Sequence, residues 1–360
     1  MNTKHYSVFF NIRVKLMLPL LCCILMGSAG CHRDHLPPIS TGGHDYAQVN
    51  LVADITGYGA ARTDQNLANP WGMAVSTKGT IWVCCNQSGQ CLTFDTSGNQ
   101  LYSPVATPFN GHLNGASPNG IVFNTTVDFI TKGRPAFCLC STEDGIIKAW
   151  VDGDSMVTVA DRSANGALYK GITIANDGTG NFIYATDFLN NKIDVYDKDF
   201  HYVVGKYFKD PDLPAGFSPF NICNIGGKLF VTYAKQKGPD FHDDQPGIGN
   251  GYIDIFGPDG SLIKRFASQG TLNSPWGITQ ASADFGQVAN AILVANYGDG
   301  HITVFDPNGV YQGQIENNGA PITIDGLWGI SFVLNNTTQL YFTSGPANES
   351  HGLFGYLKVK

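Results

Sequence analysis

Six residues of mixed chemical type recur at a step of roughly 50 along the chain, each directly before a glycine or the residue that replaces it. They are four aromatic side chains, one amide and one cation: Trp71, Asn119, Lys170, Phe220, Trp276 and Trp328. Aromatic faces and a cation give affinity for small molecules, sugars or peptides without catalysis. If the fold gathers these positions, we expect a ligand-binding mouth with aromatic walls and a few polar groups. The alternative is that each tryptophan only wedges neighbouring sheets apart.

The charged stretch 235–251 could also carry chemistry. His242 stands beside Asp243 and Asp244 in it and is a candidate general base. Long connections in compact domains are usually functional or disordered, so this stretch is either a lid over the mouth or a solvated insertion. The sequence contains no Gly-x-Ser-x-Gly elbow, no His-Glu-x-x-His motif and no Gly-Lys-Ser/Thr phosphate loop. The common serine hydrolase, zinc protease and P-loop classes are therefore excluded.

The residues around each recurrence predict the elements that would position these side chains. Each Pro-x-Gly-like start opens an apolar strand, and a second apolar strand follows that ends in a small residue, as in 81–84, 182–185 and 292–295. A third strand alternates more cleanly, as in 192–197 and 301–306, and is expected nearer to solvent. A period near 50 with this content predicts an all-β fold, a six-bladed β-propeller of four-stranded antiparallel blades.

The ends of the repeat array predict how the ring closes. The last repeat finishes at 352–359 with a third strand, so its outer strand must come from elsewhere if no open edge is to remain. Residues 46–52 form the unassigned strand before the first repeat. We therefore predict a propeller over 45–360 whose N-terminal strand pairs with the last blade.

Several stretches carry a family resemblance: 69–72, 232–236 with 242–244, 274–277, 325–329 and 345–355. They resemble an uncharacterised family of secreted bacterial six-bladed β-propellers, which is itself similar to NHL-repeat and SMP-30-like propellers. The resemblance covers the chain from about residue 48 to its C-terminus and implies the fold and export. That family carries no established activity to transfer.

The similarity to SMP-30-like rings has a chemical implication, because such rings bind a divalent ion through carboxylates and amides from several blades. It implies that Ca²⁺ or Mg²⁺ could bind here, with four candidate ligands: Glu143, Asp187, Asn119 and Asn221. The competing interpretation is that carboxylates in turns only support their turns. The resemblance thus adds an alternative function, a metal-dependent lactonase- or esterase-like hydrolase in which a carboxylate or His242 activates water.

The first 30 residues have the pattern of an export signal. A basic start precedes an apolar run over 16–26, and Ser28-Ala29-Gly30 stand directly before Cys31. We predict a signal peptide over 1–30, with lipidation of Cys31 or plain secretion as the alternatives. Residues 31–44 are rich in proline and glycine and predict a flexible tether. An outer-membrane or periplasmic lipoprotein, or a secreted protein, would contact membrane only through its lipid anchor.

Composition narrows the possible partners. The formal net charge is −7, and no basic run interrupts the sequence. Such a body should not bind nucleic acid through phosphates. We therefore expect a small molecule, a glycan or a protein as the partner at the central face.

Four of the nine cysteines can be interpreted from their spacing. Cys85 and Cys91 flank a predicted hairpin turn and could form a disulfide in an oxidising compartment. Cys138 and Cys140 alternate with apolar residues and are expected to be small fillers rather than ligands. No second Cys or His pair lies at zinc-ligand spacing.

Overall fold

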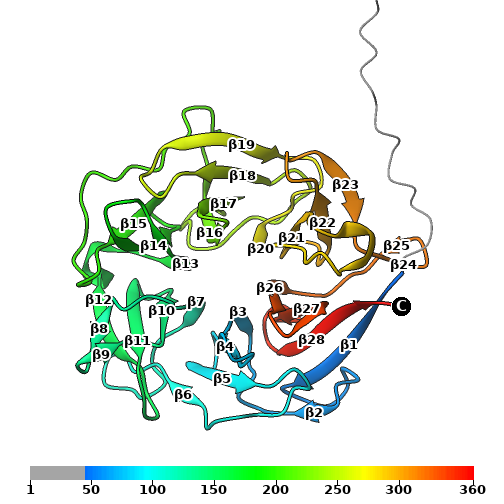
Figure 1. Ribbon diagram of the computed structural model, residues 1–360, viewed down its shortest axis with the longest axis horizontal. Coiled ribbons are helices and arrows are strands. Elements are labelled where there is room, and N and C mark those ends of the chain that lie inside the picture. Colours follow the sequence, from blue (N-terminus) through cyan, green and yellow to red (C-terminus); the bar gives the residue numbers. More distant parts are fainter. Residues whose placement is uncertain (1–44) are drawn as a thin grey trace, which may run out of the picture. The chain divides into compact units, whose positions relative to one another are not determined.

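The computed structural model describes residues 45–360, which form a six-bladed β-propeller (Figure 1). The described residues contain 28 β-strands and two short 3-10 helices, Ser163–Asn165 and Gly286–Val288. None of their helices is long and apolar enough to cross a membrane. The predicted signal peptide over 1–30, the lipidation of Cys31 and the tether over 31–44 lie outside the described residues.

Within each of the first three blades, the strands are given in order from the innermost to the outermost. Blade 1 contains β3 (Pro70–Val75), β4 (Ile81–Cys85), β5 (Gln90–Phe94) and β6 (Val105–Ala106). Blade 2 contains β7 (Pro118–Phe123), β10 (Cys138–Thr142), β11 (Ile146–Trp150) and β12 (Val157–Asp161). Blade 3 contains β13 (Tyr169–Asn176), β14 (Asn181–Asp187) and β15 (Lys192–Tyr196). In blade 3 a single bridge between Tyr196 and Tyr202 takes the position of a fourth strand.

The remaining blades complete the ring. Blade 4 contains β16 (Phe217–Ile225), β17 (Lys228–Lys235), β18 (Gly251–Phe256) and β19 (Leu262–Ser268). Blade 5 contains β20 (Pro275–Gln280), β21 (Ile292–Asn296), β22 (Ile302–Phe305) and β23 (Tyr311–Gln314). Blade 6 contains β26 (Leu327–Val333), β27 (Asn336–Ser344), β28 (Leu353–Val359) and β1 (Tyr46–Ala53). Three minor pieces are β2 (Arg62–Thr63) and the hairpins β8 (Ile130–Thr131) with β9 (Arg134–Pro135) and β24 (Glu316–Asn317) with β25 (Ala320–Pro321).

The predicted closure of the ring is confirmed. Strand β1 pairs antiparallel with β28, from Tyr46 opposite Val359 to Ala53 opposite Leu353. The N-terminal strand therefore supplies the outer strand that the last repeat lacks, and the short β2 then adds to β1 in parallel. Figure 1 shows β1 and β28, from opposite ends of the chain, side by side.

The hydrophobic core is divided among the seams between blades. Between blades 6 and 1, for example, Tyr341 and Phe354 pack with Ile81, Val83 and Leu92 in one buried cluster. Equivalent clusters fill the other five seams, because the inner strands are apolar on both faces. This packing explains why those strands read as continuous apolar runs in the sequence.

The repeated glycine has a packing reason. A Cβ on Gly72 would lie 2.0 Å from the carbonyl oxygen of Asn119, and one on Gly277 would lie 2.5 Å from the carbonyl oxygen of Trp328. The innermost strands of neighbouring blades thus touch through their main chains around the axis, and a side chain there would force them apart. Each innermost strand needs a glycine at this contact, and this need explains why the glycine recurs at a step of about 50 residues.

The predicted pairing of Cys85 with Cys91 is wrong by one residue, because the disulfide joins Cys84 and Cys91. Cys84 stands directly opposite Cys91 in the antiparallel pair of β4 and β5, whereas Cys85 stands opposite Gln90. Side chains directly opposite each other share one face of a sheet, and the next residue points to the other face. Cys85 accordingly packs in the seam between blades 6 and 1.

Candidate functional site

Five of the six predicted ring residues meet at one end of the propeller axis, where they are buried, whereas the side chain of the buried Asn119 bonds to Tyr169 and Ser141. Trp71, Trp276 and Trp328 expose only 3%, 4% and 1% of their surface. Trp71 and Trp328 stack with ring centroids 3.7 Å apart, and Trp276 meets both edge-on. We call these three tryptophans with Phe188 and Phe220 the axial cluster. Its rings fill the mouth that the sequence pattern predicted them to line.

Lys170 is the buried cation of this end. Its ammonium lies 5.0 Å from the ring centroid of Trp71, within cation–π range. It forms an ion pair with Glu143, and the carboxylate of Asp243 lies 3.9 Å away. Burial by itself would lower the pKa of Lys170, but Glu143 and Asp243 outweigh burial, so the net effect is a raised pKa. Lys170 is therefore a permanent positive charge beside the axial cluster.

The amides of Asn119 and Asn221 join one blade to the next. Asn119 Nδ2 donates to the carbonyl oxygen of Tyr169, while its Oδ1 accepts from Ser141 Oγ at 2.6 Å. Asn221 Nδ2 donates to the carbonyl oxygen of Trp276 at 2.9 Å. Both positions lie beside register shifts in the innermost strand pairs, where carbonyl groups leave the regular ladder. These side chains therefore satisfy main-chain groups of the neighbouring blade.

The two candidate carboxylate ligands occupy separate environments. Glu143 is held by Lys170 and by Asn86 Nδ2 at 2.8 Å. Asp187 is fully buried, accepts from the main-chain N–H of Leu168 at 3.1 Å, and has a pKa raised by burial. Among residues 45–360, neither belongs to a group of three acidic, His or Cys ligands with metal-binding spacing. The Ca²⁺ or Mg²⁺ site over Glu143, Asp187, Asn119 and Asn221 stays a prediction.

Of the two interpretations of the long connection, the structure favours a cover. Gln236 Nε2 donates to the carbonyl oxygen of Phe188, in the axial cluster, at 2.8 Å. Asp244 bridges back to Gln236 and is only 8% exposed. The tip of the segment faces solvent, and His242, the candidate general base, is exposed there, away from the buried groups. We call residues 236–250 the cover segment.

Buried polar groups without partners gather at this same end. Four buried side-chain atoms at the axial end of the described residues lack a hydrogen bond: Asn69 Oδ1, Trp71 Nε1, Trp328 Nε1 and Ser344 Oγ. Asp244 and Ser274 hydrogen-bond each other there, and burial raises the pKa of Asp244 to about 6 despite this bond and the nearby Lys170 ammonium. Unpaired buried groups are costly and need an explanation, which a bound ligand would supply.

A tyrosine and a glutamate form the wall opposite Lys170. Tyr297 stacks on Trp328 at 4.0 Å, and its hydroxyl donates to Glu349 Oε1 at 2.6 Å. Asn69 Nδ2 donates to Glu349 Oε2 at 2.7 Å. His351, two residues after Glu349, has its Nδ1 atom 2.9 Å from Asp54 Oδ2. Tyr297 was not predicted from the sequence, because it follows the end of β21 and does not stand before a repeat glycine.

Beyond the axial cluster the channel opens into a cavity of about 420 Å³. Trp276 closes one side of it, and its walls are the innermost strands after each repeat glycine. Small polar side chains such as Thr125, Thr173, Thr279 and Ser331 lie among its lining residues. The propeller is therefore hollow along part of its axis and plugged at the tryptophan end.

Comparison with known sequences identifies relatives. No family model matches the chain. Uncharacterized protein L690 of Acanthamoeba polyphaga mimivirus is 34% identical over 327 residues, covering 86% of this chain and 85% of the relative. Uncharacterized protein R648 of the same virus is 34% identical, with 86% and 79% covered. The chain belongs to this family. Its members have no assigned activity, and because they are viral, the expected bacterial and secreted character stays an expectation.

Solved structures support the fold. Virginiamycin B lyase from Staphylococcus aureus is 14% identical, with a TM-score of 0.51 over 88% of this chain and 100% of that one. A gluconolactonase from Xanthomonas campestris is 15% identical, with a TM-score of 0.50 and 81% and 86% covered. The Penicillium chrysogenum α-L-arabinanase complexed with arabinobiose is 13% identical, with a TM-score of 0.57 and 87% and 97% covered. At these identities the likeness shows the propeller fold alone.

Proposed function

We propose that the protein is a ligand-binding propeller that takes a small polyhydroxylated molecule, of the glycan type, at the tryptophan end of its axis. The observation that carries this proposal is the gathering of four unpaired buried polar atoms, Asn69 Oδ1, Trp71 Nε1, Trp328 Nε1 and Ser344 Oγ, at the axial cluster. Each such atom costs about 1–3 kcal/mol when it is left without a partner. A ligand that paired with them would recover part of that cost on binding.

The types of the unpaired atoms indicate the ligand chemistry. The indole N–H groups of Trp71 and Trp328 are donors, while Asn69 Oδ1 is an acceptor. A hydroxyl group donates and accepts at one atom, so a molecule with several hydroxyls can pair with both kinds. The neighbouring charges of Lys170 and Glu349 are already matched by protein groups, so a charged ligand is not required. Because Trp71 and Tyr297 both stack on Trp328, the ligand would meet these rings through their N–H edges and not through their faces.

Access to this end requires the cover segment to move. The cluster tryptophans are almost completely buried, and the cover segment contacts this end of the axis through Gln236 and Asp243. The contact between Asp243 and Lys170 spans 3.9 Å and its carboxylate side chain is 72% exposed. The segment is also held by Gln236, which donates to the carbonyl oxygen of Phe188, and by the main-chain N–H of Gly247, which donates to Asn273 Oδ1 at 2.6 Å. In this proposal the segment acts as a lid, and ligand binding must break these contacts to displace it.

A binding assay with single-atom changes tests this proposal. The probes are a panel of mono- and disaccharides, scored first by the shift in melting temperature and then by calorimetric titration. Trp328→Phe removes the indole N–H but keeps an aromatic ring, so a bound sugar should lose about five- to tenfold in affinity. Trp150→Phe, on β11, is the matched control and should bind normally. If no sugar binds, or if Trp328→Phe binds as tightly as the parent, the proposal fails.

A second candidate function is a metal-dependent hydrolase of lactones or esters. One observation favours it: Asp244 is a buried carboxyl whose pKa of about 6 suits proton transfer near neutral pH. A Ca²⁺ or Mg²⁺ ion would supply carbonyl polarisation, and Glu143 is the candidate ligand nearest to this centre. Hydrolysis of a lactone and ester panel, with either ion and with chelator, tests this reading. If the Asp244→Asn variant still hydrolyses the substrate, Asp244 takes no part in the mechanism.

We also propose that the protein is exported and anchored at the cell envelope through a lipid on Cys31, with no other membrane contact and no nucleic-acid partner. The net charge of −7 and the basic-then-apolar N-terminal pattern support this placement. Labelling with a fatty-acid analogue tests it, because Cys31→Ala should abolish the label. Label that persists in that variant would contradict the anchor.

A further inference from the structure

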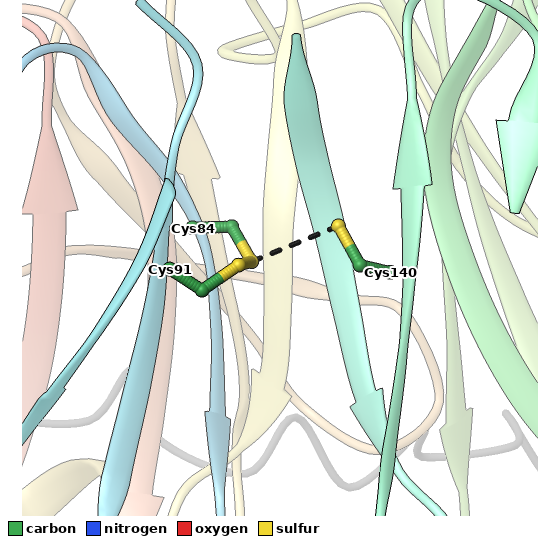
Figure 2. Close-up of side chains that lie close together, drawn as sticks. All are labelled: Cys84, Cys91 and Cys140. Atoms are coloured by element: carbon green, nitrogen blue, oxygen red, sulfur yellow. Dashed lines mark hydrogen bonds between the residues drawn. A yellow bond between two sulfur atoms is a disulfide. The ribbon is translucent and has the colours of Figure 1, made fainter. Parts of the chain in front are cut away.

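Three cysteine sulfurs converge inside the seam between blades 1 and 2. Cys84 and Cys91 form the disulfide between β4 and β5, and Cys140 on β10 points its sulfur at them (Figure 2). The sulfur of Cys140 lies 3.7 Å from that of Cys84, and all three sulfurs lie within 4.8 Å of one another. All three residues are fully buried. Two blades thus bring their sulfur atoms to one point.

The placement of Cys140 is poorly suited to disulfide exchange. An attacking thiolate approaches a disulfide along the extension of the sulfur–sulfur bond, but Cys140 lies close to both sulfurs and so faces the side of that bond. A sulfur that lies within 4.8 Å of both others instead matches one corner of a three-ligand group.

The surroundings favour a soft cation. The seam around the sulfurs is apolar and contains Met156 and Trp82. Thiolate ligands select Cu(I) and zinc, but structural zinc takes four protein ligands. Three sulfurs in an apolar seam fit the lower coordination number of Cu(I). Lys148 stands opposite Cys140 in the strand pair and is almost fully buried, so its positive charge offsets part of the negative charge of three thiolates.

We propose that the reduced protein binds one Cu(I) ion between blades 1 and 2 through Cys84, Cys91 and Cys140. A dithiol reductant first supplies two electrons and two protons, which breaks the disulfide and converts the dithiol to its own disulfide. The ion then forms three copper–sulfur bonds and displaces the three thiol protons. The oxidised protein offers a single thiol at this place and does not hold the ion.

Competition with a chromogenic Cu(I) chelator tests the site. Full-length protein is reduced with a phosphine under nitrogen, freed of the phosphine, and titrated with Cu(I) in the presence of bicinchoninate. The parent should withdraw one ion per chain from the chelator. Cys140→Ser should weaken binding at least about tenfold, the loss that even outer-shell partners of a metal cause. Cys138→Ser, equally buried on the same strand but outside the group of three, should bind as the parent does.

Two results would overturn the proposal: equal Cu(I) affinity for the parent and Cys140→Ser, or equal affinity for the reduced and unreduced parent. Near-ultraviolet circular dichroism shows whether Cys140→Ser keeps its packing. If that variant does not fold, X-ray absorption of the copper-loaded parent decides. Three sulfur neighbours would support the site, and nitrogen, oxygen or fewer than three sulfur neighbours would refute it.

Discussion

Replacing Asp244 by asparagine should stabilise the protein at neutral and alkaline pH. The carboxyl is buried, and burial raises its pKa from the ordinary value of 3.8 to about 6. A group whose pKa is raised on folding contributes stability below its unfolded pKa, and that contribution is lost as pH rises through the folded pKa. A shift of about two pKa units corresponds to about 3 kcal/mol. The ionised carboxylate should therefore weaken the fold by up to that amount above pH 7.

Urea denaturation across a pH series measures this effect. Asp244→Asn should match the parent near pH 4 and exceed it in free energy of unfolding by up to about 3 kcal/mol at pH 8. Asp243→Asn is the matched control, because its side chain is 72% exposed, and it should show no such pH-dependent gain. A difference that stays constant with pH, or a variant less stable than the parent at pH 8, would refute the reasoning.

Two further predictions concern the contacts between blades. Gly72→Ala places a Cβ 2.0 Å from the main-chain oxygen of Asn119 and should cost more than about 2 kcal/mol in thermal or urea unfolding, whereas Gly180→Ala, with no atom nearer than 3.8 Å, should cost far less. Equal costs would contradict the proposed contact of innermost strands. Thr343→Val removes a hydroxyl that donates to a main-chain carbonyl of blade 1 and should cost about 1–3 kcal/mol, while Thr338→Val, exposed on the same strand, should be close to neutral. A neutral Thr343→Val would show that the blade-to-blade hydrogen bond contributes little.

The repeat allowed the fold to be predicted from the sequence. Gly72 and its equivalents recur because each one meets a neighbouring main chain, so the physical contact and the sequence signal are the same feature. The closure by residues 46–52 was also predictable, since one strand was missing and one was unassigned. These inferences needed only the order of elements along the chain.

The site could be predicted only in part. The position of Trp71, Trp276 and Trp328 before the repeat glycines correctly predicted that they lie together at one end of the axis. Spacing cannot tell, however, whether the rings line an opening or pack against each other. The partner of Cys91 depended on register, which a hairpin of uncertain turn length leaves ambiguous by one residue. Asp244 became notable only through its burial, and burial of a connection is set by tertiary packing.

The last blade contains strands from both ends of the described chain, and this arrangement has a consequence for protein synthesis. Strand β1 leaves the ribosome first among the described strands and β28 last, yet they are hydrogen-bonded partners. Until the final residues emerge, β1 has no edge to join, and the nascent chain must carry an unpaired apolar strand through the whole of translation. Pairings this distant in sequence are also slow to form. The pairing of β1 with β28 that closes the ring therefore leaves β1 without this partner for as long as the chain is being made.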